Sequence, residues 1–110
     1  MTVNKLAAFL KGRVLAGNGE REVTGVYACD LLSWVISHAE PGDLWVTVMN
    51  NVNILAVASL TDVACIVISE GSPVDPELIR RAEEQEICLV ACEMGTAPVV
   101  WKTAALLGKQ

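Results

Sequence analysis

The chain has 110 residues, of which 53% are apolar, and thirteen acidic against eight basic side chains give it a net charge of −5. This length is typical of one domain around one hydrophobic core. The acidic balance argues against nucleic acid as a partner, because binding a phosphate backbone needs clustered Lys and Arg. It also disfavours an anionic membrane surface, and the most apolar stretch, residues 54–68, is too short and too interrupted to span a membrane.

The composition and the first residues also lead to expectations about self-association and the cellular compartment. The apolar share is above that of most soluble chains, and a small domain has much surface for its volume, so we expect a second copy to cover part of the apolar surface. No export signal is recognisable in the opening residues, which lead directly into a short amphipathic segment. We therefore expect a cytoplasmic protein in which the four cysteines are free thiols.

Strand and helix patterns alternate along the chain, with turn residues between them. In chain order the expected elements are a helix around 6–10, strands at 13–16 and 23–28, a helix at 31–38, a strand at 44–48, a helix at 54–60, a strand at 63–68, a helix starting at 75–77, a strand at 87–91 and a helix from 95–96 to 107. Such alternation with short connections predicts an α/β fold, with a mainly parallel sheet of four to five strands and helices on both faces.

Two helix starts carry recognisable capping signals. Asp75-Pro76-Glu77 combines an N-cap, a proline at the first helical position and an early acid. Asp30 is the expected N-cap of the helix that ends near His38. In that helix the i,i+4 pairs Leu31/Val35 and Leu32/Ile36 are expected to face inward.

Polar loops follow three predicted strands, at residues 50–53, 69–72 and 93–96. Parallel sheets bind ligands outside the carboxyl ends of their strands, where loops lead into helix N-termini. The candidate ligand-binding residues at this edge are Asn50, Asn51, Asn53, Ser69, Gly71 and Thr96. The competing hypothesis is that Asn51 or Asn53 and Thr96 simply cap the helices that follow them.

From residue 22 onward the order of segments resembles the DRTGG domain family. The similarity lies in residues 22–27 (EVTGVY), 30–33 (DLLS), 41–47 (PGDLWVT), 53–58 (NILAVA), 64–71 (ACIVISEG) and the helix that starts at Asp75. The resemblance implies a fold related to the N-terminal domain of HPr kinase/phosphorylase. It also implies an accessory domain, as in CBS-containing pyrophosphatases and phosphotransacetylases, that is dimeric and has no activity of its own.

The chain departs from the motif that gives this family its name. Asn50, Asn51 and Asn53 stand where many members carry an acidic and a basic residue, and Ser69-Glu70-Gly71 stands where they carry Thr-Gly-Gly. The basic partner is missing, and Glu70 adds a negative charge where a glycine would let a ligand approach the backbone. Both changes argue against a phosphate-type ligand.

The sequence offers no constellation for catalysis or metal binding. Nucleophilic catalysis needs a base beside the nucleophile, and no local motif sets a Ser or Cys against His38, which is the one histidine. Cys88 and Cys92 lie four residues apart but form no CxxC pair, so we expect them in the core rather than around zinc. We expect no catalytic residue, no metal and no cofactor.

The last helix has little polar circumference, which is typical of a helix covered on more than one side. Trp34, Val100, Trp101 and Ala104 are the candidate interface residues, whereas Trp45 is expected in the core. The sequence thus favours a non-catalytic regulatory or protein-interaction domain. We expect it to form a homodimer, to interact with a partner enzyme and to bind a small polar ligand. The alternatives are a purely structural subunit of a larger complex and an enzyme of unknown type.

Overall fold

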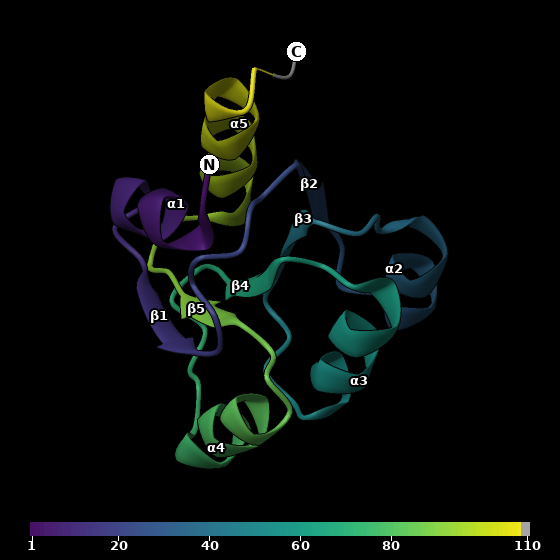
Figure 1. Cartoon of the computed structure of the whole chain (residues 1–110). Helices are drawn as coiled ribbons and strands as arrows, with labels where there is room; N and C mark the ends of the chain where they lie inside the picture. Colours follow the sequence, from purple (N-terminus) through teal and green to yellow (C-terminus); the bar gives the residue numbers. More distant parts are fainter. Residues whose placement is uncertain (109–110) are drawn as a thin grey trace.

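The computed structural model describes residues 1–108, in which helices and strands alternate as expected (Figure 1). In chain order the elements are α1 (Val3–Phe9), β1 (Arg13–Ala16), β2 (Gly25–Ala28), α2 (Leu32–His38), β3 (Asp43–Thr47), α3 (Asn53–Thr61), β4 (Cys65–Ile68), α4 (Pro76–Glu84), β5 (Leu89–Ala91) and α5 (Thr96–Leu106). Their bounds agree with the sequence expectations to within a few residues.

The strands form one sheet in the order β1-β5-β4-β3-β2. The four strands from β2 to β5 are parallel, and β1 pairs with β5 in the antiparallel direction, with Arg13 opposite Ala91. The predicted mainly parallel α/β sheet is therefore confirmed. Because β2 through β5 run in the same direction, the loops that follow them all emerge at one edge of the sheet.

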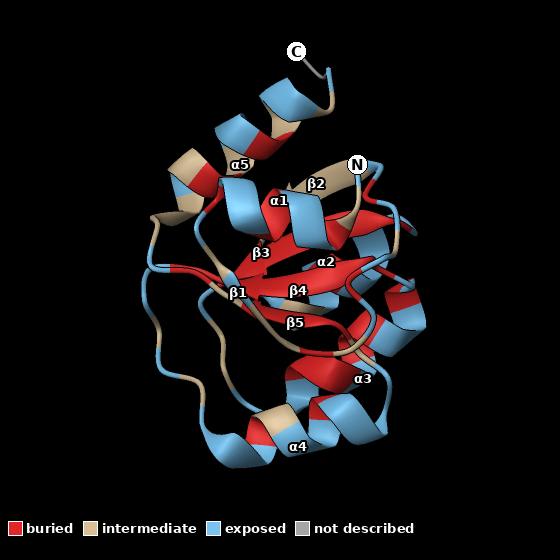
Figure 2. Cartoon of the chain, turned by 60° about the vertical axis from the view of Figure 1, so that its left-hand side comes forward, coloured by how far each residue is buried: buried red, intermediate tan, exposed pale blue. Residues whose placement is uncertain are grey.

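Helices cover both faces of the sheet (Figure 2). On one face α1 and α5 enclose a core that includes Leu6, Leu44 and Val99. On the other face α2, α3 and α4 enclose a second core, which includes Val35, Trp45 and Leu78. Every residue of β3 and β4 is buried, as expected for central strands that are covered on both sides.

The aromatic and sulfur side chains lie largely where the sequence placed them. Trp45 is fully buried, and its indole N–H donates to the Cys29 carbonyl at 3.0 Å. Cys65, Cys88 and Cys92 are buried in the core between the sheet and α1/α5, and all four thiols are free. Burial raises the pKa of the Cys65 thiol, so this group stays protonated, as expected for a core residue.

The start of α2 differs from the expectation. Asp30 does not cap the helix; its carboxylate accepts from the Thr47 hydroxyl at 2.7 Å and from the Val48 backbone N–H at 3.0 Å, because the loop after β3 lies beside it. The N-cap lies one residue later, at Leu31, and no side chain caps the helix. The predicted inward pairs are also wrong in part, since Val35 is buried but Leu31 and Ile36 are 56% and 49% exposed.

Two further expectations have mixed outcomes. The Asp75 start is confirmed, because its carboxylate accepts from the Leu78 N–H at 2.9 Å and Pro76 opens α4. Of the strand predicted at 23–28, only 25–28 forms β2, which is half-exposed because it is an edge strand of the sheet, whereas Val23 is buried in the core and Val26 packs against it. Within residues 1–108, no helix has the length and apolar character to cross a membrane.

We predict that Asp30→Ala lowers the free energy of unfolding by about 1–3 kcal/mol, because the Thr47 hydroxyl is 1% exposed and would lose its acceptor. A double-mutant cycle with Thr47→Val, followed by urea denaturation, should give a coupling energy of at least about 0.5 kcal/mol. Additive effects would show that Asp30 acts elsewhere. Asp75→Ala, which removes a helix cap, is the comparison variant and should cost about 1 kcal/mol.

Candidate functional site

The three polar loops predicted from sequence converge at the carboxyl edge of the sheet, after β3, β4 and β5. Hydrogen bonds between the loops hold them together. Asn50 donates from Nδ2 to the Pro73 carbonyl at 2.7 Å, and the Ser72 hydroxyl donates to the Val48 carbonyl at 2.9 Å. The loops after β3 and β4 therefore form one connected rim.

Asn51 and Asn53 lie at the start of α3 and are exposed. The Asn51 side-chain oxygen accepts from the Asn53 backbone N–H at 2.9 Å, which is an Asx-type turn. The N-cap is Val52, with no side-chain cap, so the expectation that an amide at this position caps the helix directly is wrong. Asn51 instead stabilises the turn that leads into the helix.

Ser69 and Thr96 come from different loops and contact each other. Ser69 is fully buried, and its hydroxyl lies 2.6 Å from that of Thr96. Gly71 adopts φ +66°, in the left-handed region that favours glycine, and its N–H donates to the Cys92 carbonyl at 3.0 Å. These contacts fasten the loop after β4 to the loop that leads into α5.

Glu70 has a role that sequence reasoning missed. Its Oε2 accepts from the Thr96 backbone N–H at 2.7 Å, while its own N–H donates to the Met94 carbonyl at 2.8 Å. The N-cap of α5 is Gly95, which has no side chain to offer, so the Glu70 carboxylate supplies the negative charge at this helix N-terminus. In the sequence, the signal for this role was an acid at a position where many members of the family carry glycine. In the structure, Glu70 adopts φ +63°, a conformation that favours glycine.

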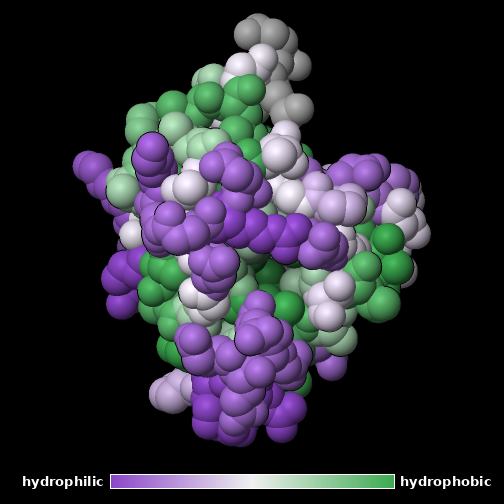
Figure 3. Space-filling model, viewed as in Figure 1, coloured by the Kyte–Doolittle hydropathy of each residue, from purple (hydrophilic) through white to green (hydrophobic). Residues whose placement is uncertain are grey.

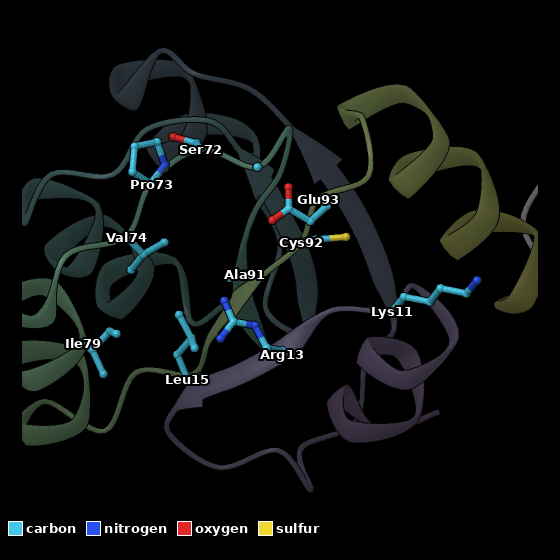
Figure 4. A pocket seen from close by; sticks show the side chains of 11 residues that line it. Lys11, Arg13, Leu15, Ser72, Pro73, Val74, Ile79, Ala91, Cys92 and Glu93 are labelled. Carbon is cyan, nitrogen blue, oxygen red and sulfur yellow. The ribbon is translucent and has the colours of Figure 1, made fainter.

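A cavity of about 280 Å³ lies at this edge, between β1, the end of β5 and the loop from β4 to α4 (Figure 4). The residues that line it come from four segments of the chain: Lys11, Arg13, Leu15, Gly71, Ser72, Pro73, Val74, Ile79, Ala91, Cys92 and Glu93. Of the six candidate residues from sequence, Gly71 borders the cavity directly. Asn50, Ser69 and Thr96 hold the loops around it, whereas Asn51 and Asn53 do not line it.

The charged side chains of the cavity come from neighbouring segments. Arg13 pairs with Ala91 across the antiparallel ladder, and Glu93 follows Ala91 by two residues in the loop after β5, so the two charged residues come from adjacent strand ends. Figure 4 shows Arg13 and Glu93 bordering the same hollow while the Lys11 side chain extends away from it. The sequence analysis missed Arg13, because no local sequence pattern indicates that β1 pairs with β5 in the antiparallel direction.

Two other cavities lie at the opposite edge of the sheet, and the arginine that lines both of them is engaged. One of about 230 Å³ and a wider hollow of about 510 Å³ share Asn18, Arg21 and Glu86. Arg21 forms an ion pair with Asp62 at 2.9 Å and also donates to two backbone carbonyls. No group of three or more His, Cys, Asp or Glu side chains within residues 1–108 is arranged to hold a metal ion.

The candidate interface residues lie on two helices that cover opposite faces of the sheet. Trp101 on α5 is 60% exposed, and Val100 and Ala104 are half-buried beside it. Figure 3 shows apolar surface over α5, in contrast to the polar surface of α4. Trp34 on α2 is 55% exposed, but its ring stacks on His38 with centroids 4.7 Å apart, so this side chain already has a partner within its own helix.

The geometry defines an α/β domain with a small cavity at the carboxyl edge of a parallel sheet. This chain belongs to the DRTGG domain family, whose family model matches residues 5–106. No curated protein sequence matches it significantly.

A structural match accompanies the family match. The structure is similar to a crystal structure of the regulatory region of a Clostridium perfringens pyrophosphatase, which comprises CBS and DRTGG domains complexed with the activator diadenosine tetraphosphate. The TM-score is 0.68 at 12% sequence identity, and the match covers 89% of this chain but 44% of that one. The two proteins share the fold, and this chain corresponds to less than half of that region.

We predict that Glu70→Ala lowers the free energy of unfolding by about 1 kcal/mol, because the N-terminus of α5 loses its carboxylate. Glu70→Gly loses the same group but relieves the left-handed backbone, so it should be about 1 kcal/mol more stable than Glu70→Ala. Urea denaturation of the three proteins measures both differences. A Glu70→Ala variant as stable as the wild type would contradict the capping role.

Proposed function

We propose that this chain is a non-catalytic regulatory domain that binds a small polar ligand at the carboxyl edge of its sheet and associates with a second copy. The similar fold in a regulatory region supports this proposal, since there the DRTGG domain accompanies an enzyme without being its catalytic part. The partner in this case would be an enzyme or another protein whose activity responds to the domain. We further propose that residues 1–110 act as one such domain, in the cytoplasm.

One observation carries the proposal: the loops that border the cavity are the loops that hold α5. Gly71 borders the cavity, and the preceding residue, Glu70, caps the first turn of α5. Glu93 also borders the cavity, and three residues later Thr96 begins α5 and contacts Ser69. A ligand that moves either loop therefore acts on the position of α5.

The mechanism follows from differential affinity. A ligand shifts an equilibrium between two arrangements of α5 only if it binds one arrangement more tightly than the other. Couplings of this kind are typically about 1–3 kcal/mol, or roughly 5- to 150-fold in affinity. Contacts to the Gly71 and Glu93 loops would supply that difference, because both loops also contact α5.

The surface that would respond is the exposed side of α5, around Val100, Trp101 and Ala104. A large exposed indole with apolar neighbours is typical of interface anchors. We propose that a second copy covers this surface in a homodimer. Trp34 lies on the other face of the sheet and is a separate candidate contact for a protein partner.

The exposed tryptophans also favour a second candidate function, a purely structural subunit of a larger complex. This alternative shares the partner surface but requires no ligand. The two candidates differ in what the cavity does, so ligand binding decides between them.

We predict that a thermal-shift screen against nucleotides, amino acids and other small metabolites yields a ligand for the regulatory domain. At a hundred times its dissociation constant the ligand should add about 2.7 kcal/mol, which raises Tm by roughly 10 °C for a domain of this size. Ser72→Trp, which places a large side chain at the cavity, should abolish the shift while the protein stays folded. A complete screen without a shift would favour the structural subunit.

We predict that Trp101→Glu converts a dimer to a monomer, because a carboxylate would be buried without a partner in the apolar contact. Light scattering of the purified protein measures the mass. Leu60→Glu is the matched control, since Leu60 is an exposed apolar residue on α3, away from α5. A monomeric wild type, or a dimer that survives in Trp101→Glu, would overturn the proposed interface.

A further inference from the structure

Arg13 stands apart from the other arginines of the chain. Arg21 is paired with Asp62, Arg81 with Glu77, and Arg80 with both Glu77 and Glu84. Within residues 1–108, Arg13 alone among the arginines has no hydrogen-bond or ion-pair partner for its guanidinium. This group borders the cavity at the carboxyl edge.

A carboxylate without a partner lies on the same cavity. Glu93 forms no side-chain hydrogen bond or ion pair with the described residues, and it is not within ion-pair distance of Arg13. It lies beside Gly71, where an added Cβ would be 2.5 Å from Glu93 Oε2, and like Arg13 it is exposed. The cavity thus carries two opposite charges without a partner, Arg13 and Glu93, while the Lys11 side chain, which also borders it, extends away from the hollow.

Between and below these charges the wall is apolar. Leu15, Val74 and Ile79 are half-buried side chains that line the cavity and pack against the core beneath it. Figure 4 shows them on the side of the hollow away from Glu93. A ligand here would meet two opposite charges and an aliphatic surface.

The volume limits the size of the ligand. About 280 Å³ is at the small end of ligand pockets, which suits a single small metabolite. A dinucleotide such as the activator of the similar pyrophosphatase region would exceed it, and its phosphates would face Glu93 with only Arg13 and Lys11 to balance them.

We infer that this cavity binds a free α-amino acid with an apolar side chain. The ligand carboxylate would accept from the Arg13 guanidinium, the ligand ammonium would donate to Glu93, and the side chain would lie against Leu15, Val74 and Ile79. A simple anion could pair with Arg13 alone and a simple amine with Glu93 alone, whereas the zwitterion of an amino acid pairs with both. This inference rests on the proposed ligand-binding function and names the class of its ligand.

The first test compares ligands that differ by one charge. Leucine, valine, methionine and phenylalanine are titrated into the ¹⁵N-labelled protein, together with 4-methylpentanoate and 3-methylbutylamine, which are leucine without its ammonium and without its carboxylate. We expect at least one amino acid to shift the amides of 71–74 and 91–93, and each single-charge analogue of leucine to bind at least tenfold more weakly than leucine. Equal binding of 4-methylpentanoate would overturn the role of Glu93.

The second test assigns each charge to a residue. Arg13→Gln should weaken leucine at least tenfold and leave 3-methylbutylamine unaffected, whereas Glu93→Gln should weaken leucine and leave 4-methylpentanoate unaffected. Lys5→Gln and Glu86→Gln are the matched controls, since both are exposed charges away from this cavity. Equal losses in the controls would show a general charge effect and overturn the inference.

The outcomes separate this inference from the proposed function. If none of the four amino acids binds but another metabolite perturbs the same amides, the ligand class is wrong and the regulatory function stands. If no compound perturbs them, both fail.

Discussion

The parallel pairing of β2, β3, β4 and β5 is the constraint on which the rest of the structure depends. It requires a crossover between each strand and the next, which α2, α3 and α4 supply, and it gathers the loops after β3, β4 and β5 at one edge. The antiparallel strand β1 lies next to β5, and its first residue, Arg13, pairs with the last residue of β5 at the carboxyl ends of the parallel strands. The cavity exists because parallel and antiparallel pairing meet there.

The Glu70 carboxylate gives this edge its particular character. A helix N-terminus at the end of a parallel sheet attracts anions, and here the chain fills that position with its own side chain. The Glu70 carboxylate therefore occupies the position at the N-terminus of α5 that an external anion would otherwise take. Beside it, Arg13 on β1 and Glu93 in the loop after β5 have no side-chain partner among residues 1–108, and we therefore expect a ligand with both charges rather than a phosphate.

Local patterns in the sequence predicted the architecture well. Residues typical of strands predicted β3, a continuous apolar run predicted β4, and Asp75-Pro76-Glu77 predicted the start of α4, because each signal depends on adjacent residues. The errors arose where a side chain bonds across the fold. Asp30 binds Thr47 instead of capping α2, and the contribution of Arg13 depends on a strand pairing that brings it next to Ala91. The convergence of the three loops could be predicted, but the cavity beside them could not.

In the function proposed above, the cavity and α5 are coupled through the loops that contain Glu70 and Glu93. Amide hydrogen exchange of the purified protein, measured with and without a saturating ligand of the cavity, tests this coupling. With such coupling, ligand binding slows exchange both in the loops around Gly71 and Glu93 and in the first turns of α5. Slower exchange confined to the cavity loops, with α5 unchanged, would contradict it.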